Sequence, residues 1–445
     1  MSLFKIKKSI ISQSYEISSK DFIALPSRIY DKEDKQASPQ EFHWDDILIK
    51  DILSIYASIF IAAIGYGMLA VMIAFKAEQY IKNEILISLS SATQISSGII
   101  FARFLPILGR KIGLTNSIYL GTAMSSISSL LIYSYSGYFL WLLTVFIIGA
   151  SSFICGVVRQ TMTIDLAPSH IRASVISCGG MLFSIGNSLG PIFLQLVKTF
   201  DGFTTHLMIF GFLLTSMLPL SRITKIEAKV REEKKIGIWR YIKNSPKIMF
   251  ASFAVNYALS SCSTFIIIYG MKIGMDQGSA SLLLSVLLFG AVFSIPIGYL
   301  TDLINRRFLM ISCATLSVIC ALLLFQNEDP QKIYILIFLM FGCMVGIKLP
   351  AIILINEKYK PTQRLAVNSS FGKMALLGNL FGIFLTGSIM KYYGPKGLWL
   401  SIILILSSFL IFCCLNYINK AIKGDLDFSK FYFFNKNKTY DEQLP

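Results

Sequence analysis

Twelve long apolar segments dominate the sequence, and they restrict its fold more than any other feature. A helix that crosses the ~30 Å hydrocarbon core of a bilayer needs about 20 mostly apolar residues. The segments form two groups of six on either side of a polar interval. They lie near 52–75, 85–102, 114–133, 138–163, 173–197 and 202–221, then near 248–271, 277–301, 308–326, 333–356, 365–390 and 397–419. The sequence predicts an all-α integral membrane protein with twelve transmembrane helices in two pseudo-symmetric six-helix bundles.

The composition agrees with a membrane location. Of the 445 residues, 54% are hydrophobic and 15% are charged, whereas soluble domains have about 25% charged residues. The formal net charge of +16 does not indicate nucleic-acid binding, because the basic residues lie between apolar runs rather than on a soluble face. They instead favour an interaction with the anionic surface of the lipid bilayer.

Basic residues in the loops predict the topology, because lysine and arginine concentrate in cytoplasmic loops. The domains expected are a cytoplasmic tail (1–50), a first bundle (51–221), a basic cytoplasmic loop (222–247), a second bundle (248–419) and a cytoplasmic tail (420–445). Residues 1–47 lack a usable signal-peptide core. We therefore expect a multi-pass protein of the bacterial inner (plasma) membrane with both termini in the cytoplasm.

An internal repeat relates the two halves of the sequence. A shift of 192 residues superimposes chemically similar positions over the fourth and fifth segments of each half. The matched pairs are Asp165 and Glu357, Arg172 and Arg364, Gly180 and Gly372, Gly186 and Gly378, and Gly190 and Gly382. Two equivalent halves around a central path are a common architecture of secondary transporters.

The loop after the eighth segment reads Gly298-Tyr-Leu-Thr-Asp302-Leu-Ile-Asn305-Arg306-Arg307, and the loop after the second ends Gly109-Arg110-Lys111. These loops resemble the G-x-L-[A/T]-D-x-x-G-R-[R/K] loops of the major facilitator superfamily. Asn305 replaces a glycine of that pattern, and the match at 102–111 is degraded. The resemblance spans about 51–419 and implies alternating access between two bundles.

The same resemblance implies a cytoplasmic gate. In the family this loop latches the gate, a role that falls here on Gly298, Asp302, Arg306 and Arg307, and in the first half on Gly109, Arg110 and Lys111. An acid that ends one helix also pairs plausibly with an arginine that starts the next, which adds Asp165 with Arg172 and Glu357 with Arg364. The alternatives are a solvated basic turn and a capping pair that only fixes the turn.

Glycines in the fifth and eleventh segments predict close helix packing. Gly186-x-x-x-Gly190-Pro191 partly resembles an antiporter-associated motif of the family, and Gly378 and Gly382 repeat its spacing. Small residues four apart most often let two membrane helices approach closely. Helix packing is therefore the expected role of these residues.

Three basic residues lie deep within apolar segments and are the candidate substrate contacts. Lys348 and Lys373 lie nine residues from Glu357 and Arg364, ~13 Å from a helix end. Arg159 lies six residues before Asp165, ~9 Å deep. Such residues usually face a water-filled path, and the absence of acids from the central part of any segment favours an anionic solute. The alternative is snorkelling of the side chains toward water.

Motifs for catalysis, metal binding or cofactor binding do not occur in the sequence. There is no G-x-S-x-G, G-x-x-x-x-G-K-[ST] or H-E-x-x-H pattern, so we predict neither an enzyme nor a cofactor nor a metal site. The function predicted is secondary transport of a small solute, an anion being favoured, driven by a gradient of that solute or of a coupling ion. Two alternatives stay open: proton-coupled drug efflux, and a transporter-shaped membrane sensor.

Overall fold

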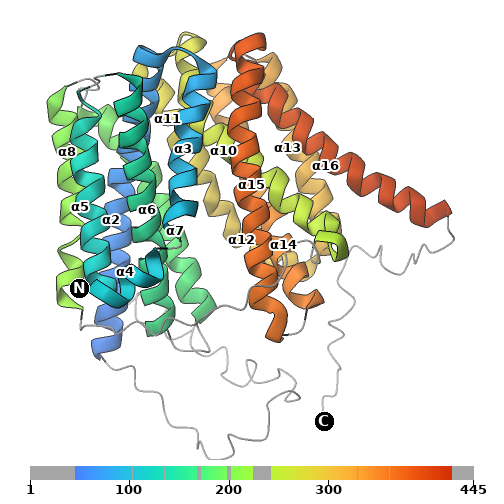
Figure 1. The fold of residues 1–445 in the computed structure, drawn as a ribbon. Coiled ribbons are helices and arrows are strands. Elements are labelled where there is room, and N and C mark those ends of the chain that lie inside the picture. The colour runs from blue at the N-terminus through green and yellow to red at the C-terminus, as the bar shows by residue number, and fades with distance from the viewer. Residues whose placement is uncertain are drawn as a thin grey trace, which may run out of the picture. The chain divides into compact units, whose positions relative to one another are not determined.

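The structure, a computed structural model (Figure 1), describes residues 46–102, 104–134, 137–167, 172–197, 202–223, 242–327, 329–359 and 361–422. The predicted tails and most of the basic central loop lie outside these residues, so their placement stays a prediction. The chain divides into Met1–Asp46 and Ile47–Pro445, and the description below concerns the second unit.

The first half is a series of helices that match the first six apolar segments. They are α2 (Asp46–Lys76) with a π-helical turn (Ala77–Ile81), α3 (Glu84–Phe101), α4 (Leu105–Ile112), α5 (Leu114–Leu131), α6 (Tyr138–Leu166), α7 (Arg172–Val197) and α8 (Phe203–Thr215). Asn83 begins α3 because its side chain accepts a hydrogen bond from the Ile85 amide at 3.0 Å, which satisfies one of the free donors at a helix start.

The second half repeats this order. Its helices are α10 (Pro246–Lys272), α11 (Gln277–Phe289), α12 (Ser294–Leu303), α13 (Arg306–Gln326), α14 (Pro330–Lys358), α15 (Pro361–Tyr393) and α16 (Gly397–Ile422). A 3-10 turn (Gly290–Phe293) joins α11 to α12. Asp276, Asn305 and Asp329 cap the helices that follow them.

Eleven helices among the described residues are long and apolar enough to cross a membrane. The remaining predicted segment is α5, which is helical but rich in serine. Three of its buried hydroxyls, on Ser117, Ser126 and Ser129, donate to carbonyls of α5 or of Gly113 just before it, so the serines leave few polar groups unsatisfied in an apolar setting. The prediction of an all-α membrane protein with two six-helix halves is confirmed.

Glycines hold the fifth helix of each half against the first. A Cβ atom on Gly186 would lie 2.7 Å from the Phe60 carbonyl oxygen, and one on Gly378 would lie 2.3 Å from that of Phe253. One turn further, added Cβ atoms would lie 2.5 Å from the Met68 amide at Gly190 and 2.4 Å from the Tyr257 carbonyl oxygen at Gly382. Pro191 is buried beside Gly190. The same backbone approach thus recurs at the two places related by the repeat.

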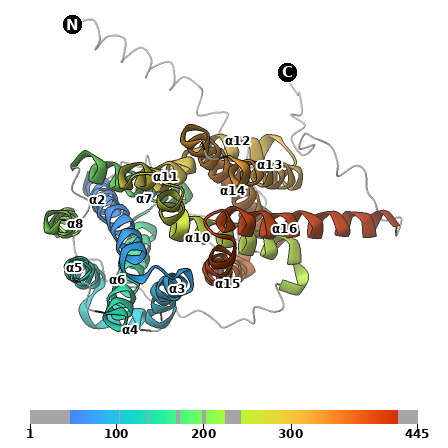
Figure 2. The same ribbon diagram turned by 90° about the horizontal axis from the view of Figure 1, so that it is seen from above.

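The two halves meet where α3 packs on α15 and α7 packs on α11 (Figure 2). Ser88 of α3 donates to the Ile383 carbonyl of α15 at 3.0 Å, and Gly278 of α11 lies against Gln195 of α7. Lys272, at the last turn of α10, pairs with Glu84 at the start of α3. We call this end of the helices, where Glu84, Lys272 and Gly278 lie, the closed end.

Candidate functional site

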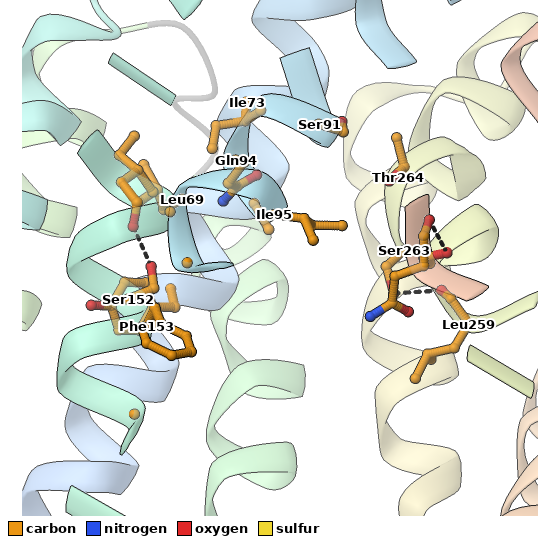
Figure 3. A pocket seen from close by; sticks show the side chains of 18 of the residues that line it. Leu69, Ile73, Ser91, Gln94, Ile95, Ser152, Phe153, Leu259, Ser263 and Thr264 are labelled. Carbon is orange, nitrogen blue, oxygen red and sulfur yellow. Dashed lines mark hydrogen bonds between the residues drawn. The ribbon is translucent and has the colours of Figure 1, made fainter. Parts of the chain in front are cut away.

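A cavity of about 910 Å³ lies between the two halves. Residues of α2, α3, α6 and α7 line it from the first half, and residues of α10 and α15 line it from the second. Figure 3 shows Ser91 and Gln94 of α3 on one side of this space and Leu259, Ser263 and Thr264 of α10 on the other. The cavity is therefore bounded by side chains of both halves.

The cavity runs from the closed end toward the opposite end of the helices. At the closed end it is lined by Ala77, Ile87 and Ile268. Farther along, Gly156, Gln160 and Gly180 belong to its lining and are exposed. The three residues at the closed end are buried, so the cavity is more enclosed there than in this farther part.

Apolar side chains form most of the cavity wall, and a smaller set of polar residues interrupts them. The apolar members include Leu69, Ile73, Ile95, Ile148, Phe153 and Phe183. The polar members carry hydroxyl or amide groups, with one exception. Of all the described residues that line the cavity, Arg159 is the one with a charged side chain.

Arg159 is held deep in the wall by α6. It is 5% exposed, and its Nη2 atom donates to the Ser216 hydroxyl at 3.4 Å, a long and weak hydrogen bond. Its Nε atom is buried and has no hydrogen-bond partner among the described residues. Among those residues Arg159 also forms no ion pair. The cavity therefore contains a buried cation with hydrogen-bond donors to spare.

Lys348 and Lys373 lie elsewhere. Neither belongs to the cavity lining. Lys373 is exposed and Lys348 is partly buried in α14. The structure thus brings only one of the three sequence-predicted bases to the cavity, and a role of the two lysines as substrate contacts stays a prediction.

Two of the predicted gate residues pair with each other. Arg306, at the start of α13, forms an ion pair with Glu357, near the end of α14, and its Nε atom donates to the Thr301 carbonyl at 3.3 Å. Asn305 caps α13, because its side chain accepts from the Arg307 amide at 3.1 Å. Asparagine is a preferred residue at that position of a helix, which gives a physical reason for its presence where the motif has glycine.

The other predicted gate residues are dispersed. A Cβ atom on Gly298 would meet nothing within 4 Å, and one on Gly109 would make an ordinary contact with Leu114 at 3.6 Å. Arg307, Lys111 and Asp165 are exposed. The side chains of Asp302, Arg110, Arg172 and Arg364 lie outside the described part of the structure. Their gating roles stay predictions.

Comparison with known families decides the identity. The model of the Major Facilitator Superfamily matches residues 55–291 and 272–422. The chain belongs to this superfamily. It is accordingly a multi-pass membrane transporter of some solute, as the motif at 298–307 suggested.

The following proteins resemble this superfamily member at low sequence identity. The uncharacterized MFS-type transporter YcaD of Salmonella arizonae is 21% identical over 321 residues, which is 71% of this chain and 82% of YcaD. Among solved structures, the nucleoside transporter NupG has a TM-score of 0.65 at 14% identity over 83% of this chain and 98% of its own. A bacterial Spinster homologue in an inward-facing, occupied conformation has a TM-score of 0.65 at 13% identity over 85% and 98%.

The structure of this superfamily member also shows ionic residues that sequence reasoning did not single out. Glu78, Glu84 and Lys272 come together at the closed end, with Lys272 Nζ 3.9 Å from Glu78. They stand at the ends of apolar segments, where charge is ordinary, so hydropathy gave no signal. Their pairing depends on the packing of the first half against the second.

Among the described residues, no group of three or more histidine, cysteine or carboxylate side chains is arranged to hold a metal ion.

Proposed function

We propose that this chain is a secondary active transporter that carries a small organic anion across the bacterial inner membrane by alternating access, with no enzymatic step of its own. Arg159 is the observation that carries the proposal. It is the charged member of the cavity wall, it is buried, and no described carboxylate pairs with it.

The energetics of a buried guanidinium support an anionic substrate. Removing an ionised side chain from water costs several kcal/mol unless a partner of opposite charge offsets the loss. Guanidinium is well suited to carboxylate and phosphate because it donates two parallel hydrogen bonds. Ser216 accepts only a weak bond from Nη2, and Nε has no partner among the described residues, so the guanidinium keeps unused N–H donors that an anion could satisfy.

The apolar wall further restricts the substrate. Leu69, Ile148 and Phe153 face the same cavity as Arg159, and burial of apolar area contributes roughly 25 cal/mol per Å² to binding. A substrate with one anionic group and an apolar portion satisfies both parts of the wall. A cationic drug does not, because it would lie beside Arg159 without a counter-charge.

The contacts between the halves support alternating access. Lys272 with Glu84, and Ser88 with Ile383, tie the halves together at the closed end, while lining residues of the farther part, such as Gln160, are exposed. With the predicted orientation, in which both termini are cytoplasmic, the closed end faces outward and the cavity opens to the cytoplasm. Movement of the halves about the cavity would exchange these two states.

Counterflow in proteoliposomes tests the proposal. The protein is reconstituted with labelled monocarboxylates, neutral amides and cationic dyes, each with and without an imposed pH gradient. We expect exchange of a carboxylate that Arg159→Gln abolishes and that Arg159→Lys retains in part, because lysine keeps the charge but loses the bidentate geometry.

A matched variant separates a contact from a general charge effect. Lys391→Gln removes one positive charge from an exposed residue outside the cavity, and we expect it to exchange the carboxylate normally. Loss of exchange in Lys391→Gln with normal exchange in Arg159→Gln would contradict the proposed site. Exchange of cationic dyes alone, dependent on a pH gradient, would replace the proposal by drug efflux.

A further inference from the structure

We propose that the cavity holds a second subsite near its closed end, which binds uncharged hydrogen-bonding groups of the substrate. Ser91 and Gln94 of the first half and Thr264 and Asn379 of the second half form it. The inference rests on the proposed function, because the same molecule would present its anionic group to Arg159. The substrate class is then a hydroxylated or amide-bearing organic anion rather than a purely lipophilic acid.

The polar groups of these four side chains are available, whereas those of their neighbours are not. All four line the cavity, and within the described part of the chain none of their side chains has a hydrogen-bond partner. By contrast, Ser90 donates to the Ile87 carbonyl at 2.9 Å and Ser263 donates to the Leu259 carbonyl at 2.8 Å. Gln160 of the lining also lacks a partner among the described residues, but it lies next to Arg159 in the chain. Away from Arg159, the free groups are two from each half.

Contacts between helices place the Gln94 and Asn379 side chains at similar distances from the closed end. Ser88 donates to the Ile383 carbonyl, which fixes where α3 meets α15. Gln94 follows Ser88 by six residues, ~9 Å along the helix, and Asn379 precedes Ile383 by four, ~6 Å. Because α3 runs away from the closed end and α15 runs toward it, both side chains lie farther from the closed end than the Ser88–Ile383 hydrogen bond. One belongs to each half.

The other two side chains lie about one turn nearer the closed end. Ser260 donates to the Asn379 carbonyl at 3.1 Å, and Thr264 follows Ser260 by one turn of α10. Figure 3 shows Thr264 across the cavity from Ser91 and Gln94. A molecule that bonds to this set therefore touches both halves at once.

Arg159 completes a two-point site from the first half. A Cβ on Gly149 of α6 would lie 2.0 Å from the Gln94 carbonyl oxygen, so these two residues are level. Arg159 follows Gly149 by ten residues, about 15 Å along the axis. Helical side chains lean toward the helix N-terminus, which brings the guanidinium back toward the subsite. The separation between the guanidinium and the subsite suits a short organic anion whose uncharged polar group lies at the opposite end of the molecule from its anionic group.

Hydrogen bonding in this subsite would act on specificity. Hydroxyl and carboxamide groups both donate and accept without carrying charge. When the halves close around a substrate, polar groups that find no partner become buried and unsatisfied, which opposes closure. A substrate with a hydroxyl or carboxamide at this point is accepted, and an apolar analogue of equal size is disfavoured.

Three probes of nearly equal shape test the subsite. Adipamate carries a carboxylate and a terminal carboxamide, 6-methylheptanoate replaces the carboxamide by an isopropyl group, and adipamide replaces the carboxylate by a second carboxamide. Binding of each is measured calorimetrically to the full-length protein in lipid nanodiscs. We expect adipamate to bind at least about tenfold more tightly than 6-methylheptanoate, a ratio that equals about 1.4 kcal/mol.

Two adjacent residues of α10 provide the variant and its control. Thr264→Val keeps the shape of the side chain but removes the free hydroxyl. We expect it to weaken the binding of adipamate severalfold and to leave the binding of 6-methylheptanoate unchanged. Ser263→Ala removes a hydroxyl that is already bonded to the backbone, and we expect it to change neither. Gln94→Leu is the second variant on the opposite half, and the thermal midpoint of each protein verifies folding.

The outcomes separate the two proposals. Equal binding of the two acids, both lost in Arg159→Gln, would overturn the subsite and leave the anion proposal standing. Equal binding of adipamate and adipamide, both weakened by Thr264→Val, would support the subsite and overturn the anion proposal. No detectable binding of adipamate would overturn the subsite.

Discussion

Lys272 in the second half forms an ion pair with Glu84 in the first half. Lys272 lies in the last turn of α10, near its C-terminus, and Glu84 lies in the first turn of α3, near its N-terminus. A base near a helix C-terminus and an acid near a helix N-terminus are each favoured by the helix dipole. The pair therefore both completes two helices and joins the two halves across the closed end.

Removing this pair should loosen the closed end. The Lys272 and Glu84 side chains are 23% and 13% exposed, so their ion pair should lie at the upper end of the range for surface pairs. We expect Lys272→Met to shift the equilibrium between the states in which this end is closed and open by about 1 kcal/mol, roughly fivefold in population. The measurement is the rate at which Ser263→Cys reacts with an impermeant maleimide added from the closed-end side, in a background with Cys178 and Cys414 replaced by serine.

A surface ion pair supplies the control for that experiment. Lys332 pairs with Asp329 at 3.5 Å within one half, and both side chains are well exposed. We expect Lys332→Met to leave the labelling rate unchanged. An unchanged rate in Lys272→Met as well would mean that the α3–α15 and α7–α11 packing alone keeps the end closed.

Gly149 should tolerate no side chain, whereas Gly156 on the same helix should. A Cβ on Gly149 would lie 2.0 Å from the Gln94 carbonyl oxygen, and one on Gly156 would meet nothing within 4 Å. Alanine raises intrinsic helix propensity equally at both sites, so the difference between Gly149→Ala and Gly156→Ala isolates packing. We expect Gly149→Ala to cost about 1–3 kcal/mol, measured as a lower thermal midpoint, and similar midpoints would contradict the close α3–α6 approach.

The Arg306–Glu357 pair should matter for transport more than for stability. Glu357 is 54% exposed, and such pairs contribute at most about 1 kcal/mol. We expect Arg306→Glu to reduce counterflow strongly with little change in the thermal midpoint, and the exchanged pair Arg306→Glu with Glu357→Arg to recover part of it. Lys243→Gln, at an exposed residue outside the predicted gate, serves as the control. Counterflow that stays low in the exchanged pair would contradict a gating role of this ion pair.

Asp276 should stabilise the start of α11 above acidic pH. Its side chain accepts from the Ser279 amide at 3.1 Å, and hydrogen bonds from Ser279 hold the pKa of Asp276 below its ordinary value. The contribution is therefore complete at neutral pH and is lost as the pH falls below about 4. We expect Asp276→Ala to cost about 1 kcal/mol and Asp276→Asn to cost little, because asparagine also caps helices. Thermal midpoints at pH 7 test this, and equal losses in both variants would contradict a capping role.

The sequence predicted features that depend on residue type and spacing along one helix. The apolar segments became helices because hydropathy and length alone decide whether a segment can span a bilayer. The glycines of the repeat, such as Gly186 and Gly378, were found because a missing side chain at fixed spacing marks a close approach. Even α5, whose serines lower its hydropathy, was recognised from its length and place in the series.

Other features depended on how each helix is rotated about its axis. Residue numbers gave the depth of Arg159 and Lys373 along their helices, but a helix turns about 100° per residue, so a single sequence does not state which neighbour each side chain faces. Packing directs Arg159 into the cavity and leaves Lys373 outside it. Contacts between residues far apart in the chain, such as Glu84 with Lys272, likewise exist only after the halves have packed.

The sequence by itself therefore determined the membrane location, the helical class, the two related halves and the family, because these follow from local hydropathy, spacing and motif. Only the tertiary structure decided which charge lines the cavity, which hydroxyls stay free and which residues tie the halves together. The physical reason is that a side chain's environment is set by the neighbouring helices, and those neighbours come from distant parts of the chain.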